Sequence, residues 1–464
     1  MQRILTNQTP KEIGNTVRLA GWIATRRDHG KLVFLDLRDR EGIVQVVFKD
    51  SKEAEAVRPE WVVEIEGEVK ERPESMRNEE IPTGGVEVAA VRLTVLAKSQ
   101  PLPFPIDTPG YDIEEETRLK YRYLDLRRPR LQRNLKARSA YVQAAREYLF
   151  SKGFTEIETP MLTKSTPEGS RDFVVPSRIY PGKFFALPQS PQQYKQLLMA
   201  AGFERYFQVA RAIRDEDPRA DRAFEHSQMD LEMSFASRED VMEIVEGMTV
   251  AAVEKIGGNI AKKPFPVITY KEAMETYGAD KFDLRTGKEK EEGKLSFAWV
   301  VDFPFFEKTK EGKWTFTHNP FSAPVNEEQE GWLLEGKNIG KIITSQYDLV
   351  CNGLEVAGGS IRTHKPEVLK ATFRILGYGD EEMEEKFGHM LEAFRFGTPP
   401  HGGCAQGFER LLMAFLNEEY LREVQAFPQT GQGRTSVMDA PSELSKEQLK
   451  ELHLEITAKP SKKK

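Results

Sequence analysis

The stretch AIRDEDPRADRAFEHSQMDLEMSF, residues 212–235, joins a loop crowded with both charge signs to a run of alternating character. In residues 226–235 apolar and polar side chains alternate: Met229, Leu231, Met233 and Phe235 against Asp230, Glu232 and Ser234. A period of two predicts a β-strand with one apolar and one polar face. Polar groups on a central strand are costly to bury without a partner or a ligand, so the strand predicts a binding site. For the charges of the loop, a solvated surface is the alternative interpretation, and we expect Asp217, Asp221 and Glu225 to be solvated or mutually paired.

The charged half of this stretch indicates how a nucleotide would be held. The sequence has no phosphate-binding P-loop, because in TGKEKEEGKLS five residues separate Gly287 from Gly293 and Leu295 stands where Ser or Thr is required. Arginine side chains are another means of binding phosphate, since a guanidinium offers paired donors to phosphate oxygens and keeps its charge. Arg214 opens the charged loop, and Glu216 can orient a guanidinium or accept from an amine.

Two further stretches carry polar groups. Residues 346–364 hold three charged candidates in a pattern that predicts strand, turn and strand: Asp348, Glu355 and Arg362. The expected bend is Gly358–Gly359. Residues 394–416 combine prolines and glycines, which allow close backbone approach, with Arg410 at the start of a strongly apolar helix. A helix-surface cation is the alternative interpretation of an isolated Arg410.

Composition narrows the class of protein. The chain has 464 residues, 39% hydrophobic and 30% charged, with a formal net charge of −6. It is no polycation, so a nucleic-acid contact requires a local patch. No stretch approaches the roughly 18 apolar residues of a membrane span, and the N-terminus lacks an apolar signal core. Two distant cysteines, Cys351 and Cys404, suggest no disulfide framework and favour a reducing, cytoplasmic setting.

The chain divides into two domains. Five β-branched, roughly alternating runs lie within residues 1–98: 17–24, 31–39, 42–50, 61–69 and 85–97. Five such strands fit a small closed barrel of the oligonucleotide-binding type, or OB-fold. A proline-rich segment begins an expected linker, residues 99–130, and a helical pattern that ends at Gly153 opens a larger domain of mixed strands and helices, residues 131–464. Within that domain the charged residues 286–294 predict a solvated connector.

These motifs resemble the bacterial aspartyl-tRNA synthetase family, of class II. The resemblance rests on GFTEIETPML for the first motif, FQVARAIRDED with HSQMDLEMSF for the second and GTPPHGGCAQGFERL for the third. TPEGSRDFVVPSR and ALPQSPQQYKQLLM are similar to signatures of the aspartate enzymes, and residues 19–48 resemble the family's anticodon-binding barrel. The resemblance implies an α+β chain, with a five-stranded OB-fold followed by an antiparallel sheet flanked by helices.

The resemblance also implies ATP and Mg²⁺ as cofactors. Arg214 matches the catalytic arginine that binds the α-phosphate and the amino-acid carboxylate, and Arg410 matches the arginine beside the γ-phosphate. Catalysis of this kind works by positioning and electrostatics. Asp348 and Glu355 match Mg²⁺ ligands. The implied ATP-binding residues are Arg214, Asp215, Glu216, Gln228, Glu355, Gly407, Phe408, Glu409 and Arg410.

The implied amino-acid pocket selects L-aspartate. Its members are Glu168, Gln192, Lys195, Arg214, Asp230, His318 and Arg362. Lys195 and Arg362 match the pair that grips the side-chain carboxylate. We expect neutral asparagine to leave these two cations uncompensated, which gives discrimination of about 10⁴-fold. Read alone, Lys195 is a solvated helix lysine.

The chain departs from the family pattern at several places. The large inserted domain between the second and third motifs has no counterpart in the sequence, and residues 286–294 stand in its place. A paired histidine motif reads His318-Asn319, and Glu409 stands where Asp is usual. Gln406 replaces an aromatic residue and Ala357 replaces a glycine. Asn319 therefore changes the expected hydrogen bonds of the pocket, while no departure removes a charge from the proposed chemistry.

The barrel is expected to read the anticodon. Arg27, Phe34 and Gln45 match anticodon-reading positions, and His29 stands where strict aspartate enzymes tend to carry leucine. The resemblance therefore implies charging of tRNA(Asp) and also tRNA(Asn), with a partner amidotransferase correcting the second product. A strictly tRNA(Asp)-specific enzyme is the alternative, with His29 as a polar turn residue and Phe34 as core.

The same residues argue against other classes of protein. A lysine enzyme needs an acidic pocket, an asparagine enzyme does not need both Lys195 and Arg362, and a tRNA-free asparagine-forming paralogue lacks the barrel. A tRNA-binding protein without ligase activity does not need Arg214, Glu355 and Arg410 together.

Residues 153–162 match a dimer-interface motif, which predicts a homodimer with an isologous contact.

Overall fold

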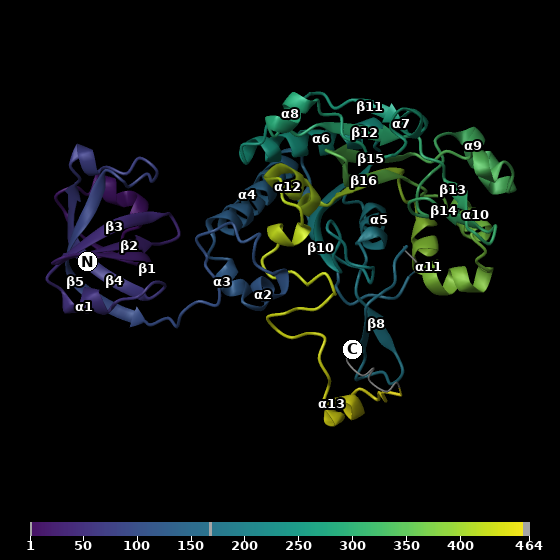
Figure 1. Ribbon diagram of the computed structural model, residues 1–464. Helices are drawn as coiled ribbons and strands as arrows, with labels where there is room; N and C mark the ends of the chain where they lie inside the picture. The colour runs from purple at the N-terminus through teal and green to yellow at the C-terminus, as the bar shows by residue number, and fades with distance from the viewer. Residues whose placement is uncertain (1, 167–168, 458–464) are drawn as a thin grey trace. The chain divides into compact units, whose positions relative to one another are not determined.

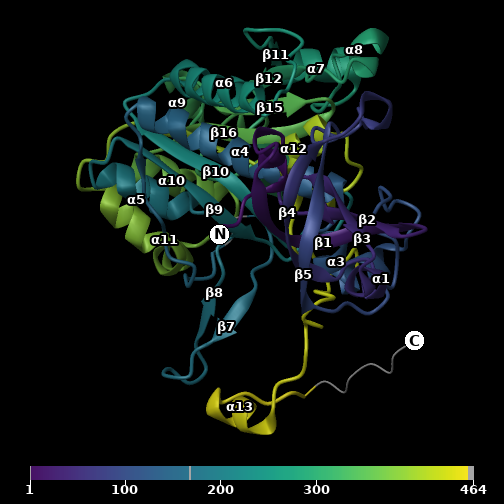
Figure 2. The same ribbon diagram turned by 90° about the vertical axis from the view of Figure 1, so that its left-hand side faces the viewer.

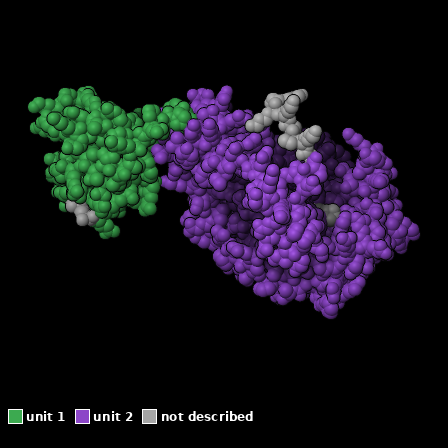
Figure 3. All heavy atoms as spheres, turned by 90° about the horizontal axis from the view of Figure 1, so that it is seen from below, with its two compact units in different colours: residues 1–105 green, residues 106–464 purple. Residues whose placement is uncertain are grey.

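The computed structural model describes residues 2–166 and 169–457. The chain forms two compact units, Met1–Pro105 and Ile106–Lys464, which Figure 3 distinguishes by colour. Residues 106–130, expected to be part of a linker, pack within the second unit. They include two short helices, α2 (Glu115–Lys120) and α3 (Arg122–Asp125), with buried side chains.

The first unit is the predicted five-stranded barrel. Its strands close in the order β1-β2-β3-β5-β4. Their bounds are β1 Thr16–His29, β2 Leu32–Arg38, β3 Ile43–Lys49, β4 Val62–Glu71 and β5 Val86–Ala97, with α1 Lys52–Ala56, η1 Thr6–Lys11 and η2 Glu74–Met76 beside them. Alternate residues such as Leu19, Val46 and Ile65 are completely buried in the interior. The alternation that predicted these strands is therefore the alternation that packs the barrel.

An eight-stranded sheet forms the centre of the second unit (Figure 1). The order is β11-β12-β15-β16-β17-β10-β9-β6, with antiparallel pairing inside and one parallel strand at each edge. The bounds are β6 Thr155–Glu156, β9 Arg205–Ile213, β10 Glu225–Ser234, β11 Val267–Thr269, β12 Phe297–Val301, β15 Gln346–Cys351, β16 Leu354–Arg362 and β17 His401–Gln406. The predicted antiparallel sheet is thus confirmed.

Three helices cover the apolar face of this sheet. They are α4 (Pro129–Ser151), α6 (Arg238–Lys255) and α12 (Phe408–Leu416), and they share one core cluster with Met229, Leu231 and Met233 of β10. The alternate residues of β10 face the other way, toward α5 (Gln192–Ala200). The two faces predicted for residues 226–235 are therefore present, and the polar one is buried rather than solvated.

The remaining elements surround the sheet. Their bounds are α7 Tyr270–Tyr277, α8 Gly287–Glu291, α9 Glu327–Glu335, α10 Pro366–Ile375, α11 Asp380–Phe394, α13 Lys446–Glu451, η3 Ile339–Lys341, η4 Leu421–Val424 and the hairpins β7 Val174–Pro176 with β8 Phe184–Ala186 and β13 Phe306–Lys308 with β14 Trp314–Phe316. Figures 1 and 2 show α13 beside the β7–β8 hairpin, where Arg178 and Glu451 form an ion pair at 3.7 Å. Among the described residues no helix is both long and apolar enough to cross a bilayer.

Two local expectations are settled by the backbone. The bend between β15 and β16 is at Asn352 and Gly353, both with positive φ, so the prediction of a bend at Gly358–Gly359 was wrong. Gly359 instead lies inside β16. This position requires glycine because a Cβ there would lie 2.1 Å from Gly403 O on the neighbouring strand. The segment 286–294 contains the short helix α8, capped by Thr286 and without a buried residue.

Candidate active site

A cavity of about 320 Å³ opens on the polar face of the sheet. Strands β10, β16 and β17, helices α5 and α12 and the loop after β9 all contribute to its wall. Twelve predicted residues line it: Gln192, Lys195, Arg214, Glu216, Gln228, Asp230, His318, Glu355, Arg362, Gly407, Glu409 and Arg410. Residues from positions 192 to 410 thus meet in one place.

In and directly behind the cavity wall, two cations and two carboxylates alternate. Lys195 Nζ lies 3.2 Å from Asp230 Oδ1 and 3.2 Å from Glu232 Oε2, and Arg362 Nε donates to Glu232 Oε1 at 3.0 Å. All four side chains are at most 2% exposed. The cations are therefore partly compensated by protein carboxylates, which corrects the expectation that only the substrate anion would balance them.

The two carboxylates differ in acidity. Burial raises the pKa of Asp230 to about 6, against the opposing effect of Lys195. Burial acts on Glu232 as well, but the Arg362 and Lys195 cations lower its pKa below the usual value. Glu232 is hence a fixed anion, whereas Asp230 can change its charge near neutral pH.

Glycines of β17 make room for this cluster. A Cβ on Gly403 would lie 1.9 Å from Glu232 Oε2 and 2.2 Å from Leu231 O, and Gly403 O accepts from Arg362 Nη2 at 3.2 Å. The close backbone approach predicted for residues 394–416 is therefore directed at the Glu232–Arg362 pair.

A second acidic pair lies on β15 and β16. Asp348 accepts from Gln346 Nε2 at 3.1 and 3.2 Å, and Lys281 Nζ lies 2.7 Å from Glu355 Oε2. Burial and Glu355 raise the pKa of Asp348 well above its usual value; burial also opposes ionisation of Glu355, but Lys281 and Arg410 lower its pKa. A Cβ on Gly358 would lie 3.1 Å from Asp348 Oδ1 and 3.6 Å from Glu355 Oε1. Two oxygen ligands thus converge on space that a side chain would fill, which fits Mg²⁺.

The charged loop after β9 forms another part of the cavity wall. Arg214 Nε donates to Gln189 O at 3.2 Å, and Arg222 Nη1 lies 2.8 Å from Glu216 Oε2. Asp221 Oδ2 lies 3.4 Å from Arg410 Nη2, so Asp221 belongs to the cavity wall. Its expected role as a solvated or locally paired residue was wrong.

Two histidines face these cations. Burial lowers the pKa of His226 to about 3, with Arg214 and Arg410 adding to the effect. Burial also lowers the pKa of His318 to about 4, although Glu355 opposes it. Both rings are neutral at pH 7 and can accept a hydrogen bond. Asn319 accepts from Phe321 N at 2.9 Å and from Ser322 Oγ at 3.3 Å, so it stabilises the loop beside His318.

Some expected site residues lie elsewhere. Asp215 pairs with Arg171 at 3.3 Å and Phe408 is buried against Tyr141, so neither lines the cavity. Glu355 lines the cavity, whereas Asp348 does not. Glu168 is outside the described residues. Gln406, one of the departures, bonds Tyr141 and Thr249 in the core and does not alter the cavity.

Sequence reasoning also missed members of the wall. The missed polar residues of the wall are Ser190, Asp221, Arg222, His226 and Lys281. Glu232, which pairs with Lys195, was noted only as one of the polar residues of its strand. Glu232 could have been found, since it shares the strand face of Asp230. Lys281 lies in a loop after α7 with no local pattern to single it out.

A separate pocket of about 370 Å³ lies on the barrel. The four predicted anticodon residues all line it: Arg27, His29, Phe34 and Gln45. Arg27 Nη2 lies 3.0 Å from Asp36 Oδ1 and 3.4 Å from Gln45 Oε1, and the His29 and Phe34 rings meet edge to face at 5.8 Å. Exposed His29 and half-buried Phe34 leave ring surface available for stacking.

The sheet, its charged cavity and the barrel define a class II aminoacyl-tRNA synthetase. Residues 114–431 match the model for tRNA synthetases class II (D, K and N), and residues 17–96 match the OB-fold nucleic acid binding domain. The chain belongs to this class II family. It is 41% identical to the Aspartate--tRNA(Asp/Asn) ligase of Rubrobacter xylanophilus over 97% of this chain and 96% of the relative. The ligase of the same name from Caldanaerobacter subterraneus is also 41% identical, over 96% of each chain.

Solved structures agree on the fold. Asparaginyl-tRNA synthetase from Pyrococcus horikoshii, complexed with asparaginyl-adenylate, superposes with a TM-score of 0.74 at 24% identity, covering 93% of this chain and 98% of that one. Aspartyl tRNA synthetase from Entamoeba histolytica gives 0.73 at 22% identity, covering 92% and 91%. The alignment with the Rubrobacter relative spans 578 positions, more than this chain contains. That relative therefore carries over a hundred positions without a counterpart here.

Proposed function

We propose that this protein joins L-aspartate to tRNA in two steps that use ATP. The observation that carries the proposal is that Arg214, Arg410, Lys195 and Arg362 all line one cavity. We assign Arg214 and Arg410 to a phosphate-binding end of this cavity, and Lys195 and Arg362 to an amino-acid end. The relatives' shared name, Aspartate--tRNA(Asp/Asn) ligase, supports the same reaction.

In the first step the aspartate α-carboxylate attacks the α-phosphorus of ATP, and the bond to pyrophosphate breaks. Arg214 holds the carboxylate and the α-phosphate together, and Arg410 holds the far end of the triphosphate. Charge builds on the phosphate oxygens in the transition state, where these fixed guanidinium groups stabilise it most. A terminal ribose hydroxyl of tRNA then attacks the aspartyl carbonyl and releases AMP.

The amino-acid end orients aspartate by charge. Asp230 and Gln192 receive the α-ammonium, while Lys195 and Arg362 receive the side-chain carboxylate. Once Asp230 is engaged by the ammonium, Glu232 is left to compensate two cations, so one positive charge awaits the substrate. Asparagine provides no anion for it. Asp348 and Glu355 would hold Mg²⁺, which when bound neutralises phosphate charge.

The barrel pocket supports the choice of tRNA. Phe34 can stack a splayed anticodon base, Gln45 can hydrogen-bond one and Arg27 can hold phosphate. His29 accepts the third anticodon base of both tRNA(Asp) and tRNA(Asn). The product on tRNA(Asn) requires a partner amidotransferase. We further propose a cytoplasmic enzyme.

A homodimer is part of the proposal. The end of the first motif exposes Met161 and Leu162, at 42% and 52%. Apolar side chains exposed beside an edge strand suit an isologous contact. Light scattering at micromolar concentration should give twice the chain mass, and a monomer would refute this part.

Pyrophosphate exchange tests the reaction itself. We expect ATP–pyrophosphate exchange with aspartate and at least 10³-fold less with asparagine or lysine, because only aspartate supplies an anion to Lys195 and Arg362. Exchange driven by asparagine or lysine would assign a different ligase, and no exchange with any of the three would leave a binding protein.

A further inference from the structure

We infer that Arg422 and Glu115, which lie outside the cavity, position the charged loop after β9 for the proposed reaction. The relevant part of that loop is the turn of residues 219–222, closed by the backbone bonds Arg219 N to Arg222 O at 2.9 Å and Arg222 N to Arg219 O at 3.4 Å. This turn places Asp221 and Arg222 in the cavity wall.

Three consecutive carbonyls of the turn are held from outside the loop. Arg422 Nη1 donates to Arg219 O at 3.3 Å, Leu421 N donates to Ala220 O at 2.8 Å, and Arg410 Nε donates to Asp221 O at 3.2 Å. Two of these donors belong to η4 and one to α12. The turn therefore takes its place from η4 as much as from the catalytic Arg410.

Arg422 is itself fixed at its base. Its Nε donates to Glu115 Oε2 at 2.8 Å, and its carbonyl accepts from Arg122 Nη2 at 2.9 Å. The side chain is 8% exposed, so the pair with Glu115 is only weakly screened. One nitrogen of this planar guanidinium bonds a carboxylate and another bonds a loop carbonyl. Arg422 therefore holds the turn at a fixed position relative to Glu115.

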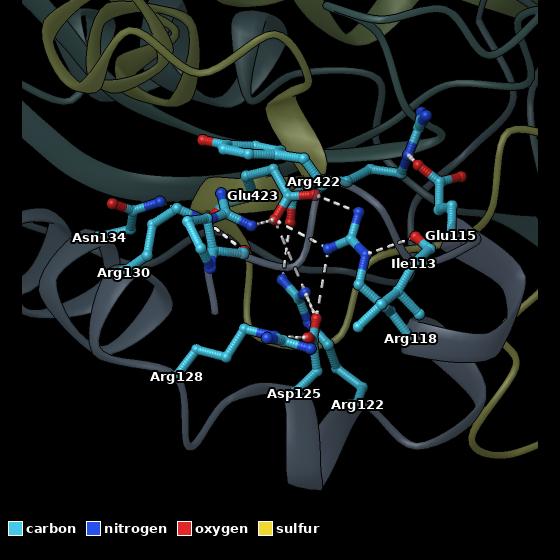
Figure 4. Close-up of polar contacts among 12 residues, drawn as sticks. Ile113, Glu115, Arg118, Arg122, Asp125, Arg128, Arg130, Asn134, Arg422 and Glu423 are labelled. Atoms are coloured by element: carbon cyan, nitrogen blue, oxygen red, sulfur yellow. Dashed lines mark hydrogen bonds and ion pairs between the residues drawn. The ribbon is translucent and has the colours of Figure 1, made fainter. Parts of the chain in front are cut away.

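The neighbouring residues make η4 stiff. Figure 4 shows η4 ringed by arginines of α2, α3 and α4, with Glu423 at the centre. Glu423 pairs with Arg118 at 3.0 Å and Arg130 at 2.9 Å, and Asp125 pairs with Arg122 at 2.9 Å. Breaking one member of a buried ion network costs stability. Glu115 and Arg422 sit at the edge of that network facing the loop, so they can be changed with less risk to the fold.

The inference rests on the proposed function, because that function assigns the loop to ATP binding. Its first test does not need the reaction. Arg219 is exposed, so trypsin can cut between Arg219 and Ala220 in the folded protein. We expect Arg422→Ala to speed this cleavage about tenfold, the effect of losing a charged hydrogen bond. Arg422→Lys should lie between, because a lysine can keep the contact with Glu115 but not both contacts. The control Arg374→Ala, which breaks an exposed pair with Asp380, should match wild type.

The second test compares the effect of each variant on the KM for ATP with its effect on the KM for aspartate. In pyrophosphate exchange, Arg422→Ala and Glu115→Gln should raise the KM for ATP several-fold and leave the KM for aspartate unchanged, with partial recovery in Arg422→Lys. Equal losses for both substrates, or unchanged cleavage and KM for ATP, would overturn the positioning role. If Arg422→Ala fails to fold by circular dichroism, Arg422→Lys and Glu115→Gln decide the question. A wild type that shows loop protection but no aspartate-dependent exchange would defeat the proposed function and leave this inference standing.

Discussion

Lys195 Nζ lies 3.2 Å from Glu232 Oε2 in the interior of the catalytic unit, where both side chains are at most 1% exposed. Glu232 also pairs with Arg362, so one carboxylate holds both cations that we assign to the substrate side chain. A shared anion keeps the two cations at a fixed spacing before substrate arrives. Preorganisation of this kind is what makes a charged pocket selective.

Replacing that shared anion should cost stability. We expect Glu232→Gln to lower the free energy of unfolding by about 3 kcal/mol, because the change leaves buried cations poorly compensated. Urea unfolding followed by tryptophan fluorescence measures it. The exposed change Glu382→Gln, which weakens a pair with Lys386 on α11, is the control and should shift stability little. A Glu232→Gln variant as stable as the control would contradict the shared role.

Aspartate binding should weaken in mild acid. Since the pKa of Asp230 is raised to about 6, this carboxylate is ionised above pH 6 and takes up a proton as the pH falls through that value. The protonated form no longer attracts the α-ammonium, so the KM for aspartate should rise by about tenfold per pH unit below 6. In Asp230→Asn the KM should be high at every pH. A wild-type KM that stays flat from pH 7.5 to 5 would remove Asp230 from the ammonium site.

The glycine of β17 should tolerate no side chain. A Cβ on Gly403 would overlap Glu232 Oε2 and Leu231 O, and the second is backbone of a central strand. We expect Gly403→Ala to lose more than about 3 kcal/mol of stability, or to yield no folded protein. Gly331→Ala in α9, where nothing lies within 4 Å, should be neutral or stabilise by about 1 kcal/mol. Equal thermal stability of the two variants would show that β17 can move.

Arg214 should matter for the transition state more than for the fold. We expect Arg214→Ala to slow pyrophosphate exchange by about 10³-fold, with an unchanged unfolding midpoint, because a phosphate clamp acts mainly as charge develops. Arg211→Ala, three residues earlier on β9 and paired with Glu225, is the matched control. An Arg214→Ala variant that exchanges like wild type would exclude this residue from catalysis.

Sequence periodicity predicted the parts of the fold that repeat. The barrel and β10 follow from alternation, because packing one face of a strand imposes a period of two on the residues themselves. The motifs brought Lys195, Arg214 and Arg410 into one expected site, and the cavity contains all three.

Features that depend on pairing across the chain were not predictable in this way. Asp221 meets Arg410 through a contact spanning 189 positions, so its local setting looks like a solvated loop. Gly359 looks like a turn residue but serves close strand packing, and only the structure shows the neighbour that requires it. The ion pair of Glu115 and Arg422 joins residues 307 positions apart, so no local sequence pattern predicts it.

The most direct test of the account compares aspartylation of tRNA(Asp) and tRNA(Asn) transcripts with radiolabelled aspartate. We predict that the wild type charges both, within about tenfold of one another, and that His29→Leu lowers charging of tRNA(Asn) by roughly 10- to 100-fold while sparing tRNA(Asp). A wild type that charges tRNA(Asp) alone would contradict the dual specificity, and one that charges neither would contradict the assignment as an aspartate ligase.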